Sequence, residues 1–119
     1  MDGSTASELL QKWTSAIKNG DPKQVTKLYD ENGILLGTFS PKERVGHELI
    51  LEYFESLLKS PVEVQIVSEH PHVYESTAVN SGHYNFVTEG KTVNARFSFV
   101  YHKDDNGWKI VSHHSSVIP

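Results

Sequence analysis

The last strand-like segment of the chain carries a run of side chains that can donate, accept or relay protons. Residues 112–116 read Ser-His-His-Ser-Ser, and imidazole and hydroxyl groups are suited to acid–base and hydrogen-bonding chemistry near neutral pH. Alternate side chains of a strand point to opposite faces. His113 and Ser115 therefore share one face, and His114 and Ser116 share the other. Either one face lines a pocket, or the run is a polar strand end exposed to solvent.

Composition limits which chemistry the chain can perform. The 119 residues include seven histidines but no cysteine, which excludes disulfides, thiolate nucleophiles and thiolate metal sites. A net charge of -4 with 11 scattered Lys and Arg residues argues against a nucleic-acid partner. No apolar run approaches the roughly 20 residues that span a membrane. We expect a soluble chain, with the cytoplasm favoured, or the plastid or periplasm if a targeting segment has been removed.

The first half of the chain has helical spacing. A capping box at Thr5 and Glu8 predicts a helix that ends at Asn19-Gly20, and Asp21-Pro22 begins a second, short helix. Apolar residues at i, i+3 and i+4 predict a third helix over residues 47–59. Between the second and third helices, residues 34–36 are expected to form a short apolar strand. This strand places Thr38 at its end.

The second half of the chain has the two-residue period of strands. Strand-like runs begin at Val62 and recur at about 72–75, 77–87, 92–102 and 108–117, with a break expected at His70-Pro71. Helices followed by an antiparallel meander predict an α+β fold. We expect one domain over residues 1–119, in which N-terminal helices pack on a curved antiparallel sheet that forms a cone-shaped pocket.

Several segments of the chain resemble proteins of the nuclear transport factor 2-like (SnoaL-like) fold. More narrowly, the chain resembles the association-domain family that includes the hub of calcium/calmodulin-dependent kinase II. The resemblance covers nearly the whole chain. It rests on the segments Ile17-Lys-Asn-Gly-Asp21, Tyr53-Phe-Glu-Ser-Leu57, Tyr101-His102 and Trp108-Lys-Ile-Val111.

A further set of motifs looks most like the iota-class carbonic anhydrases. These motifs are Leu35-Leu36-x-Thr38-x-Ser40, Tyr53-Phe54, Gly82-x-Tyr84-x-Phe86, Ala95-Arg96-Phe97-x-Phe99-Val100-Tyr101 and His113-His-Ser-Ser-x-x-Pro119. The resemblance implies reversible hydration of carbon dioxide to bicarbonate. It further implies that Thr38, Tyr53 and Ser115 orient water and bicarbonate, while His113 accepts or relays the proton.

The two-residue period then predicts which side chains line the pocket. If His113 and Ser115 face inward, we expect a substrate-binding wall made by Phe97, Phe99, Tyr101, His83 and Asn85. The opposite parity would place His114, Ser116, Ser112, Arg96 and Tyr84 inside. We favour the first arrangement because it makes the inward stripe of residues 97–101 mostly apolar.

The sequence requires no cofactor, and it excludes neither zinc nor manganese. Zinc lowers the pKa of bound water to about 7 in the familiar carbonic anhydrases, but no three-histidine site is evident here. His70 and His72 are separated by Pro71, and no third ligand accompanies them. The iota-class resemblance implies that a metal is dispensable.

Two alternative functions remain open from the sequence. One is a non-catalytic association module, and the other is a SnoaL-like isomerase or cyclase. Glu63, Glu69, Glu75 and Glu89 are expected at strand edges or turns, which would leave an isomerase without an inward base. We expect a homodimer through the outer sheet face under any of these functions, with Tyr84, Phe86, Val100 and Ile110 as its apolar contacts.

Overall fold

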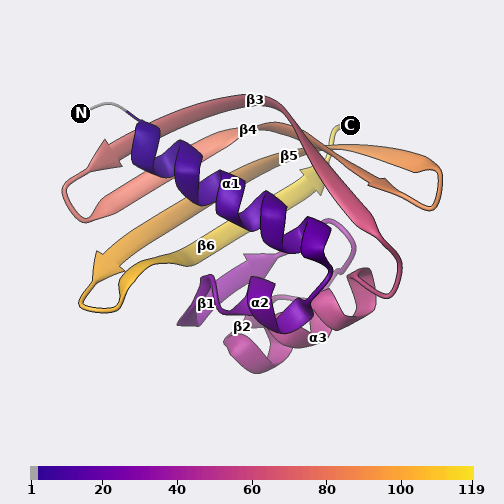
Figure 1. Ribbon diagram of the computed structural model, residues 1–119, viewed down its shortest axis with the longest axis horizontal. Helices are drawn as coiled ribbons and strands as arrows, with labels where there is room; N and C mark the ends of the chain where they lie inside the picture. Colours follow the sequence, from indigo (N-terminus) through magenta and orange to yellow (C-terminus); the bar gives the residue numbers. More distant parts are fainter. Residues whose placement is uncertain (1–2) are drawn as a thin grey trace.

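A curved sheet with helices on one side forms the body of the protein. The structure is a computed structural model and describes residues 3–119. The α+β prediction is confirmed, because the N-terminal helices pack on a six-stranded sheet (Figure 1). The elements are α1 (Ser4–Asn19), α2 (Pro22–Thr26), β1 (Tyr29–Leu36), β2 (Arg44–Val45), α3 (His47–Leu57), β3 (Val62–Tyr74), β4 (Thr77–Thr88), β5 (Lys91–Asp104) and β6 (Gly107–Val117).

Helix α1 crosses the sheet diagonally and buries one face against it (Figure 1). Leu10, Trp13 and Ile17 recur at helical spacing and are fully buried, as an amphipathic helix requires. The predicted capping box at Thr5 is wrong, since Gly3 is the N-cap and no side chain caps it. The expected stop is confirmed by Gly20, which has a φ of 78° and donates to Ile17 O.

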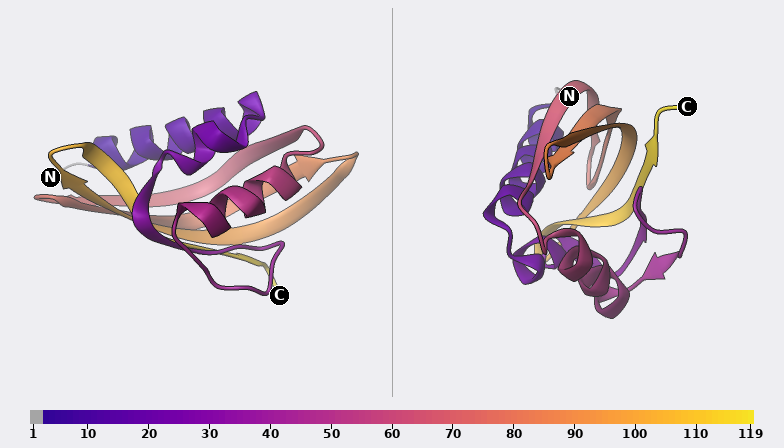
Figure 2. Two further views of the ribbon diagram at one scale, coloured as in Figure 1. Left: turned by 90° about the horizontal axis from the view of Figure 1, so that it is seen from below. Right: turned by 90° about the vertical axis from the view of Figure 1, so that its right-hand side faces the viewer.

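The sheet has the strand order β2-β1-β6-β5-β4-β3. Strands β3 to β6 form the predicted antiparallel meander, and the sheet curves strongly (Figure 2). The prediction of a wholly antiparallel sheet needs one correction, because β1 pairs with β6 in parallel. In this pairing Leu35 lies opposite His113 and Leu36 lies opposite His114. The segment that follows β1 is thereby brought beside the polar run of β6.

Strand β3 continues through the position where the sequence predicted a break. Pro71 lies inside β3 and opposite Asn80 of β4. Strand β3 is the outermost strand on its side of the sheet. The backbone nitrogen of Pro71 can therefore point away from β4, where the lack of an N–H costs no hydrogen bond of the sheet.

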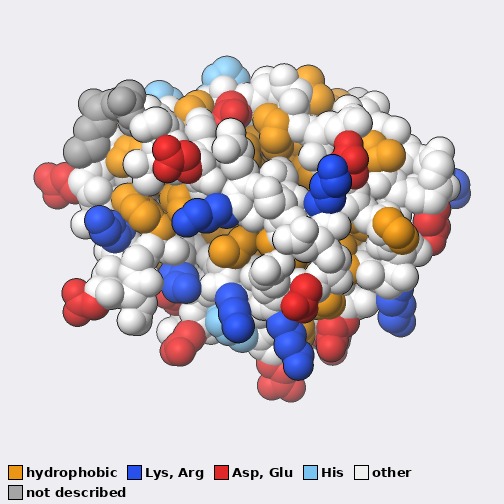
Figure 3. Space-filling view, viewed as in Figure 1, with side chains coloured by type: hydrophobic (Ala, Val, Ile, Leu, Met, Phe, Trp, Pro, Cys, Tyr) orange, Lys and Arg blue, Asp and Glu red, His pale blue; other side chains and the backbone are white. Residues whose placement is uncertain are grey.

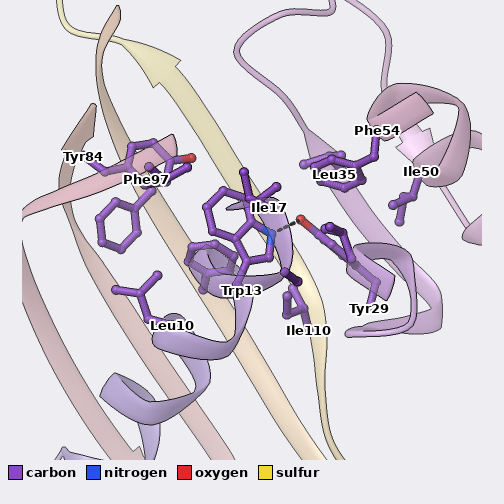
Figure 4. Packing of buried hydrophobic residues seen from close by; sticks show 14 of the residues in the cluster. Leu10, Trp13, Ile17, Tyr29, Leu35, Ile50, Phe54, Tyr84, Phe97 and Ile110 are labelled. Carbon is purple, nitrogen blue, oxygen red and sulfur yellow. Dashed lines mark hydrogen bonds between the residues drawn. The ribbon is translucent and has the colours of Figure 1, made fainter. Parts of the chain in front are cut away.

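Aromatic side chains fill the space between α1 and the sheet. Trp13 stacks on Tyr84 with ring centroids 5.8 Å apart and meets Phe99 edge-on at 5.2 Å. Tyr29 lies on the other side of Trp13, and Phe97 lines the sheet side of the same cluster (Figure 4). His113, on the inner side of the polar run of β6, therefore faces an aromatic core.

The surface around α1 carries charges of both signs. Figure 3 shows acidic and basic side chains interspersed over this face, with hydrophobic side chains between them. Within residues 3–119, no helix is long and apolar enough to cross a membrane.

Candidate functional site

Three hydroxyl groups meet where β6 passes the end of β1. Ser115 is only 5% exposed, and its Oγ lies 2.5 Å from Thr38 Oγ1 and 2.5 Å from Tyr84 Oη. Thr38 is half-buried in the segment just after β1. The parallel pairing of β1 with β6 positions Thr38 there, so two residues far apart in sequence share one cluster.

Tyr53 of α3 packs against the same segment. Its Oη accepts a hydrogen bond of 3.4 Å from the Phe39 N–H. A Cβ atom at Gly37 would lie 2.5 Å from the Tyr53 ring, so only glycine lets the phenol come this close. Burial raises the pKa of Tyr53 to about 12, which keeps its hydroxyl protonated and able to donate.

A cation lies beside Tyr53. The guanidinium carbon of Arg44 is 5.6 Å from the centre of the Tyr53 ring, and Arg44 is 9% exposed. Its Nη1 donates to Leu49 O at 2.8 Å and to Glu52 Oε1 at 3.0 Å. Arg44 lowers the pKa of the Glu52 carboxyl chiefly through this hydrogen bond. Arg44 was not among the predicted site residues.

His113 is buried between two tyrosine hydroxyls. Its Nδ1 lies 2.7 Å from Tyr29 Oη, and its Nε2 lies 3.2 Å from Tyr84 Oη. Burial, with a smaller contribution from His114, lowers the pKa of His113 to about 3. The expectation that His113 accepts the proton therefore needs correction, since an imidazole with so low a pKa does not hold a proton at physiological pH.

The inward stripe of β5 follows the favoured parity. Phe97 lies opposite Ser115, and Phe99 lies opposite His113 with ring centroids 3.9 Å apart. Tyr101 also faces inward but pairs with Ile110, farther along the strand. Its Oη has no hydrogen-bond partner within the described chain. The wall at the hydroxyl cluster is thus Phe97 and Phe99, and Tyr101 is remote from it.

On β4 the predicted parity is wrong. His83 is exposed and Asn85 is half-buried on the opposite face, whereas Tyr84 and Phe86 are buried inside. The register explains this arrangement, because Tyr84 lies opposite Ala95, and directly paired residues share a face. Neither His83 nor Asn85 joins the hydroxyl cluster, and Tyr84 takes the place expected for them.

The same correction changes the outer face. Tyr84, Phe86 and Ile110 are core residues, so they cannot form the expected dimer contact. Ile110 turns inward because the pairing of β5 with β6 shifts between Val100 and Tyr101, which leaves Val111 as an extra residue. The alternation predicted for β6 therefore holds only from Ser112 onward.

The main surface hollows lie away from the hydroxyl cluster. Surface hollows of about 390–560 Å³ occur at five other places, and Thr38, Tyr53 and Ser115 line none of these five. Half-buried Thr38 is the most exposed member of the three.

Acidic and imidazole side chains were the candidates for a general base or a metal site. Across residues 3–119, no three His, Asp or Glu side chains are grouped so that they could hold a metal ion. Glu69 does not simply sit at a strand edge as expected, since its Oε1 accepts from Ser7 Oγ at 2.9 Å and from buried Asn80 Nδ2 at 3.0 Å.

The fold defined above is that of the nuclear transport factor 2-like proteins. A protein of this fold from Pseudomonas putida, of unknown function, aligns with a TM-score of 0.86 at 14% identity over 96% of this chain and 84% of that one. A candidate ketosteroid isomerase from Parabacteroides distasonis aligns with a TM-score of 0.82 at 20% identity over 99% and 89%. Structural relatives thus include candidate enzymes.

The chain belongs to the calcium/calmodulin dependent protein kinase II association domain family, which its residues 5–119 match. A structure from Xanthomonas campestris described as a candidate member of this family aligns with a TM-score of 0.93 at 34% identity, over 100% of this chain and 89% of that one. No curated protein matches the chain. The predicted family is confirmed, and nothing in these comparisons singles out the iota-class carbonic anhydrases.

Proposed function

We propose that the protein is a carbonic anhydrase that hydrates carbon dioxide reversibly to bicarbonate and does not require a metal. The observation that carries the proposal is the bonded pair of Thr38 and Ser115 hydroxyls opposite Phe97, with Tyr53 packed against the segment that carries Thr38. These residues come from three separate elements, and they match the positions that the iota-class resemblance implies.

The cluster offers hydrogen-bond donors to an anion. Thr38 Oγ1 bonds only to Ser115, and Tyr53 Oη bonds only to the Phe39 N–H, as far as residues 3–119 are concerned. Because Tyr53 accepts in that bond, its own hydrogen is free to donate. Bicarbonate carries oxygens that accept such bonds. Arg44 beside the Tyr53 ring adds a favourable positive potential.

The reaction needs a water molecule and carbon dioxide held side by side. Phe97 supplies an apolar wall against which carbon dioxide can lie, and the hydroxyls hold water and the developing bicarbonate. The water oxygen forms a bond to carbon, the electron pair of one C=O bond moves to its oxygen, and a water proton leaves to solvent. Neutral buried His113 cannot store this proton, so we expect slower turnover than zinc-assisted enzymes achieve.

The proposal is tested by stopped-flow hydration of carbon dioxide, with a pH indicator, on chelator-treated protein. We expect catalysis above the buffer rate, and a loss of about tenfold or more in Tyr53→Phe, since a donor in the site is removed. Tyr74→Phe is the matched control, because Tyr74 is 63% exposed on the β3–β4 hairpin. Folded protein without activity above buffer would refute the proposal.

We also propose that the protein associates as a homodimer through its outer sheet face. Exposed apolar side chains on the β2–β1 side support this proposal: Ile34, Leu36 and Val45 are 40%, 38% and 55% exposed. Ile34 lies opposite both Val45 and Ser112, so the apolar group continues the outer face of β6. Sedimentation analysis should give a dimer that Ile34→Glu separates into monomers. A wild-type monomer would refute it.

A further inference from the structure

A continuous chain of six side chains connects the buried face of α1 to the hydroxyl cluster. Figure 4 shows its first link as the dashed line from Trp13 to Tyr29. The successive distances are 3.1 Å (Trp13 Nε1 to Tyr29 Oη), 2.7 Å (Tyr29 Oη to His113 Nδ1), 3.2 Å (His113 Nε2 to Tyr84 Oη), 2.5 Å (Tyr84 Oη to Ser115 Oγ) and 2.5 Å (Ser115 Oγ to Thr38 Oγ1).

The direction of the first bonds follows from what each group can do. An indole N–H can only donate, so Tyr29 Oη accepts from Trp13. Tyr29 is fully buried, and within the described chain its one hydrogen has a single acceptor left, His113 Nδ1. A neutral imidazole has one N–H, which must then be on Nε2. His113 therefore donates to Tyr84.

The same reasoning assigns the donor and the acceptor in the remaining bonds, as far as half-buried Thr38. Tyr84 Oη accepts from His113 and donates its own hydrogen to Ser115 Oγ. Ser115 then donates to Thr38 Oγ1, its remaining partner in residues 3–119. The hydroxyl hydrogen of Thr38 has no acceptor in that part of the protein. It is left for whatever lies beside this half-buried residue.

We propose that Trp13, Tyr29, His113 and Tyr84 are positioning residues that fix the direction of this chain, so that Thr38 donates and the site selects an oxyanion. This inference rests on the proposed function for the location of the site. It explains why the ligand at that site should be an oxyanion. A chain that ran the other way would present an acceptor at Thr38 and would favour ligands rich in N–H or O–H groups. In this reversed state Tyr29 Oη would accept from both Trp13 and His113, and because Trp13 cannot accept, the buried Tyr29 O–H would be left without an acceptor.

The first test is the tautomer of His113, measured by long-range ¹H–¹⁵N correlation on the labelled wild-type protein at neutral pH. We expect a neutral ring with its hydrogen on Nε2. A hydrogen on Nδ1, or an equal mixture of both tautomers, would overturn the inference. This readout needs no enzymatic activity and no variant that might fail to fold.

The second test removes one link and measures binding of ¹³C-labelled bicarbonate by NMR titration. Tyr29→Phe takes away the hydroxyl that donates to Nδ1, so we expect a mixed His113 tautomer and about tenfold weaker bicarbonate binding. Tyr101→Phe is the matched control for the tautomer, since Tyr101 is also a buried tyrosine of the inner face but its hydroxyl has no partner. Unchanged tautomer and affinity in Tyr29→Phe would contradict the inference.

The two proposals fail in different ways. A protein without hydration activity that keeps the Nε2–H tautomer, and binds bicarbonate less tightly in Tyr29→Phe, would refute the enzyme and support the directed chain. An active enzyme whose His113 carries its hydrogen on Nδ1 would support the proposed function and refute the directed chain.

Discussion

The two faces of β6 carry the same residue types in very different surroundings. His113 and Ser115 are 2% and 5% exposed, while their neighbours His114 and Ser116 are exposed and half-buried. The inner pair lies opposite Phe99 and Phe97, and the outer pair lies opposite Ser98 and Arg96. The register of the strand, rather than the residue types, therefore decides which histidine and which serine take part in the site.

The largest difference between the faces should appear in stability. His113→Ala removes the partner of two buried tyrosine hydroxyls and leaves a cavity beside Phe99, so we expect a loss of about 2–5 kcal/mol. His114→Ala, on the exposed side, should change stability by about 0.5 kcal/mol or less. Urea unfolding of both variants measures this contrast, and equal losses would contradict the assigned difference between the two faces.

The inner face should also respond to acid. The pKa of His113 is about 3 in the folded protein, against about 6.5 for an unperturbed histidine. Between these values the unfolded chain binds a proton that the folded protein does not. The contribution of neutral His113 to stability is therefore fully present above about pH 6.5. Below that pH, and down to about pH 3, the free energy of unfolding should fall by about 1.4 kcal/mol for each pH unit.

Carboxylates elsewhere add to acid unfolding, so a variant isolates the histidine. His113→Asn cannot titrate, and its unfolding free energy should depend less steeply on pH over that window. Unfolding of both proteins in urea at several pH values gives the two slopes. Equal slopes would show that His113 is not held neutral by the fold.

A smaller effect is expected where β1 meets α3. In Gly37→Ala the new methyl group would come within 2.5 Å of the Tyr53 ring, so the phenol must move. We expect a stability loss of about 1–3 kcal/mol, together with reduced carbon dioxide hydration in the protein that remains folded. Full activity in Gly37→Ala would mean that the position of Tyr53 is unimportant for the site.

Two buried tyrosines of the inner face should differ from each other, and the smallest effect is expected for Tyr101. Tyr84→Phe breaks bonds to His113 and Ser115 and should cost about 1–3 kcal/mol. Tyr101→Phe removes a hydroxyl that has no partner in residues 3–119, so its stability should be unchanged or slightly higher. Thermal unfolding compares the two variants, and a larger loss in Tyr101→Phe would contradict the assigned network.

Local signals in the sequence predicted most elements of the fold. Asp21 caps α2 by accepting from the Lys23 N–H, and Gly20 ends α1 in the left-handed conformation. Short-range rules of this kind depend only on neighbouring residues. The parallel pairing of β1 with β6 and the two-residue strand β2 escaped prediction, because they depend on contacts between segments far apart in the chain.

The site was predictable only in part, because some of its features depend on neighbouring residues and others on contacts between distant segments. The inward orientation of His113 and Ser115 followed from the apolar stripe of β5, but the parity of β4 was assigned wrongly. A usable signal existed: Glu89 and Gly90, both with positive φ, form a two-residue hairpin loop that pairs Thr88 with Lys91. Counting back from that pair places Tyr84 opposite Ala95 and on the inner face. Neither the pKa of His113 nor the role of Tyr29 could be read without the three-dimensional packing.

The most direct measurement of the central claim is carbon dioxide hydration by Ser115→Ala beside Ser116→Ala. The two substitutions are chemically identical and adjacent, but they lie on opposite faces of β6. We predict that Ser115→Ala loses about a hundredfold in rate, while Ser116→Ala keeps the wild-type rate. Equal rates in the two variants, with both proteins folded, would contradict the assignment of catalysis to the inner face.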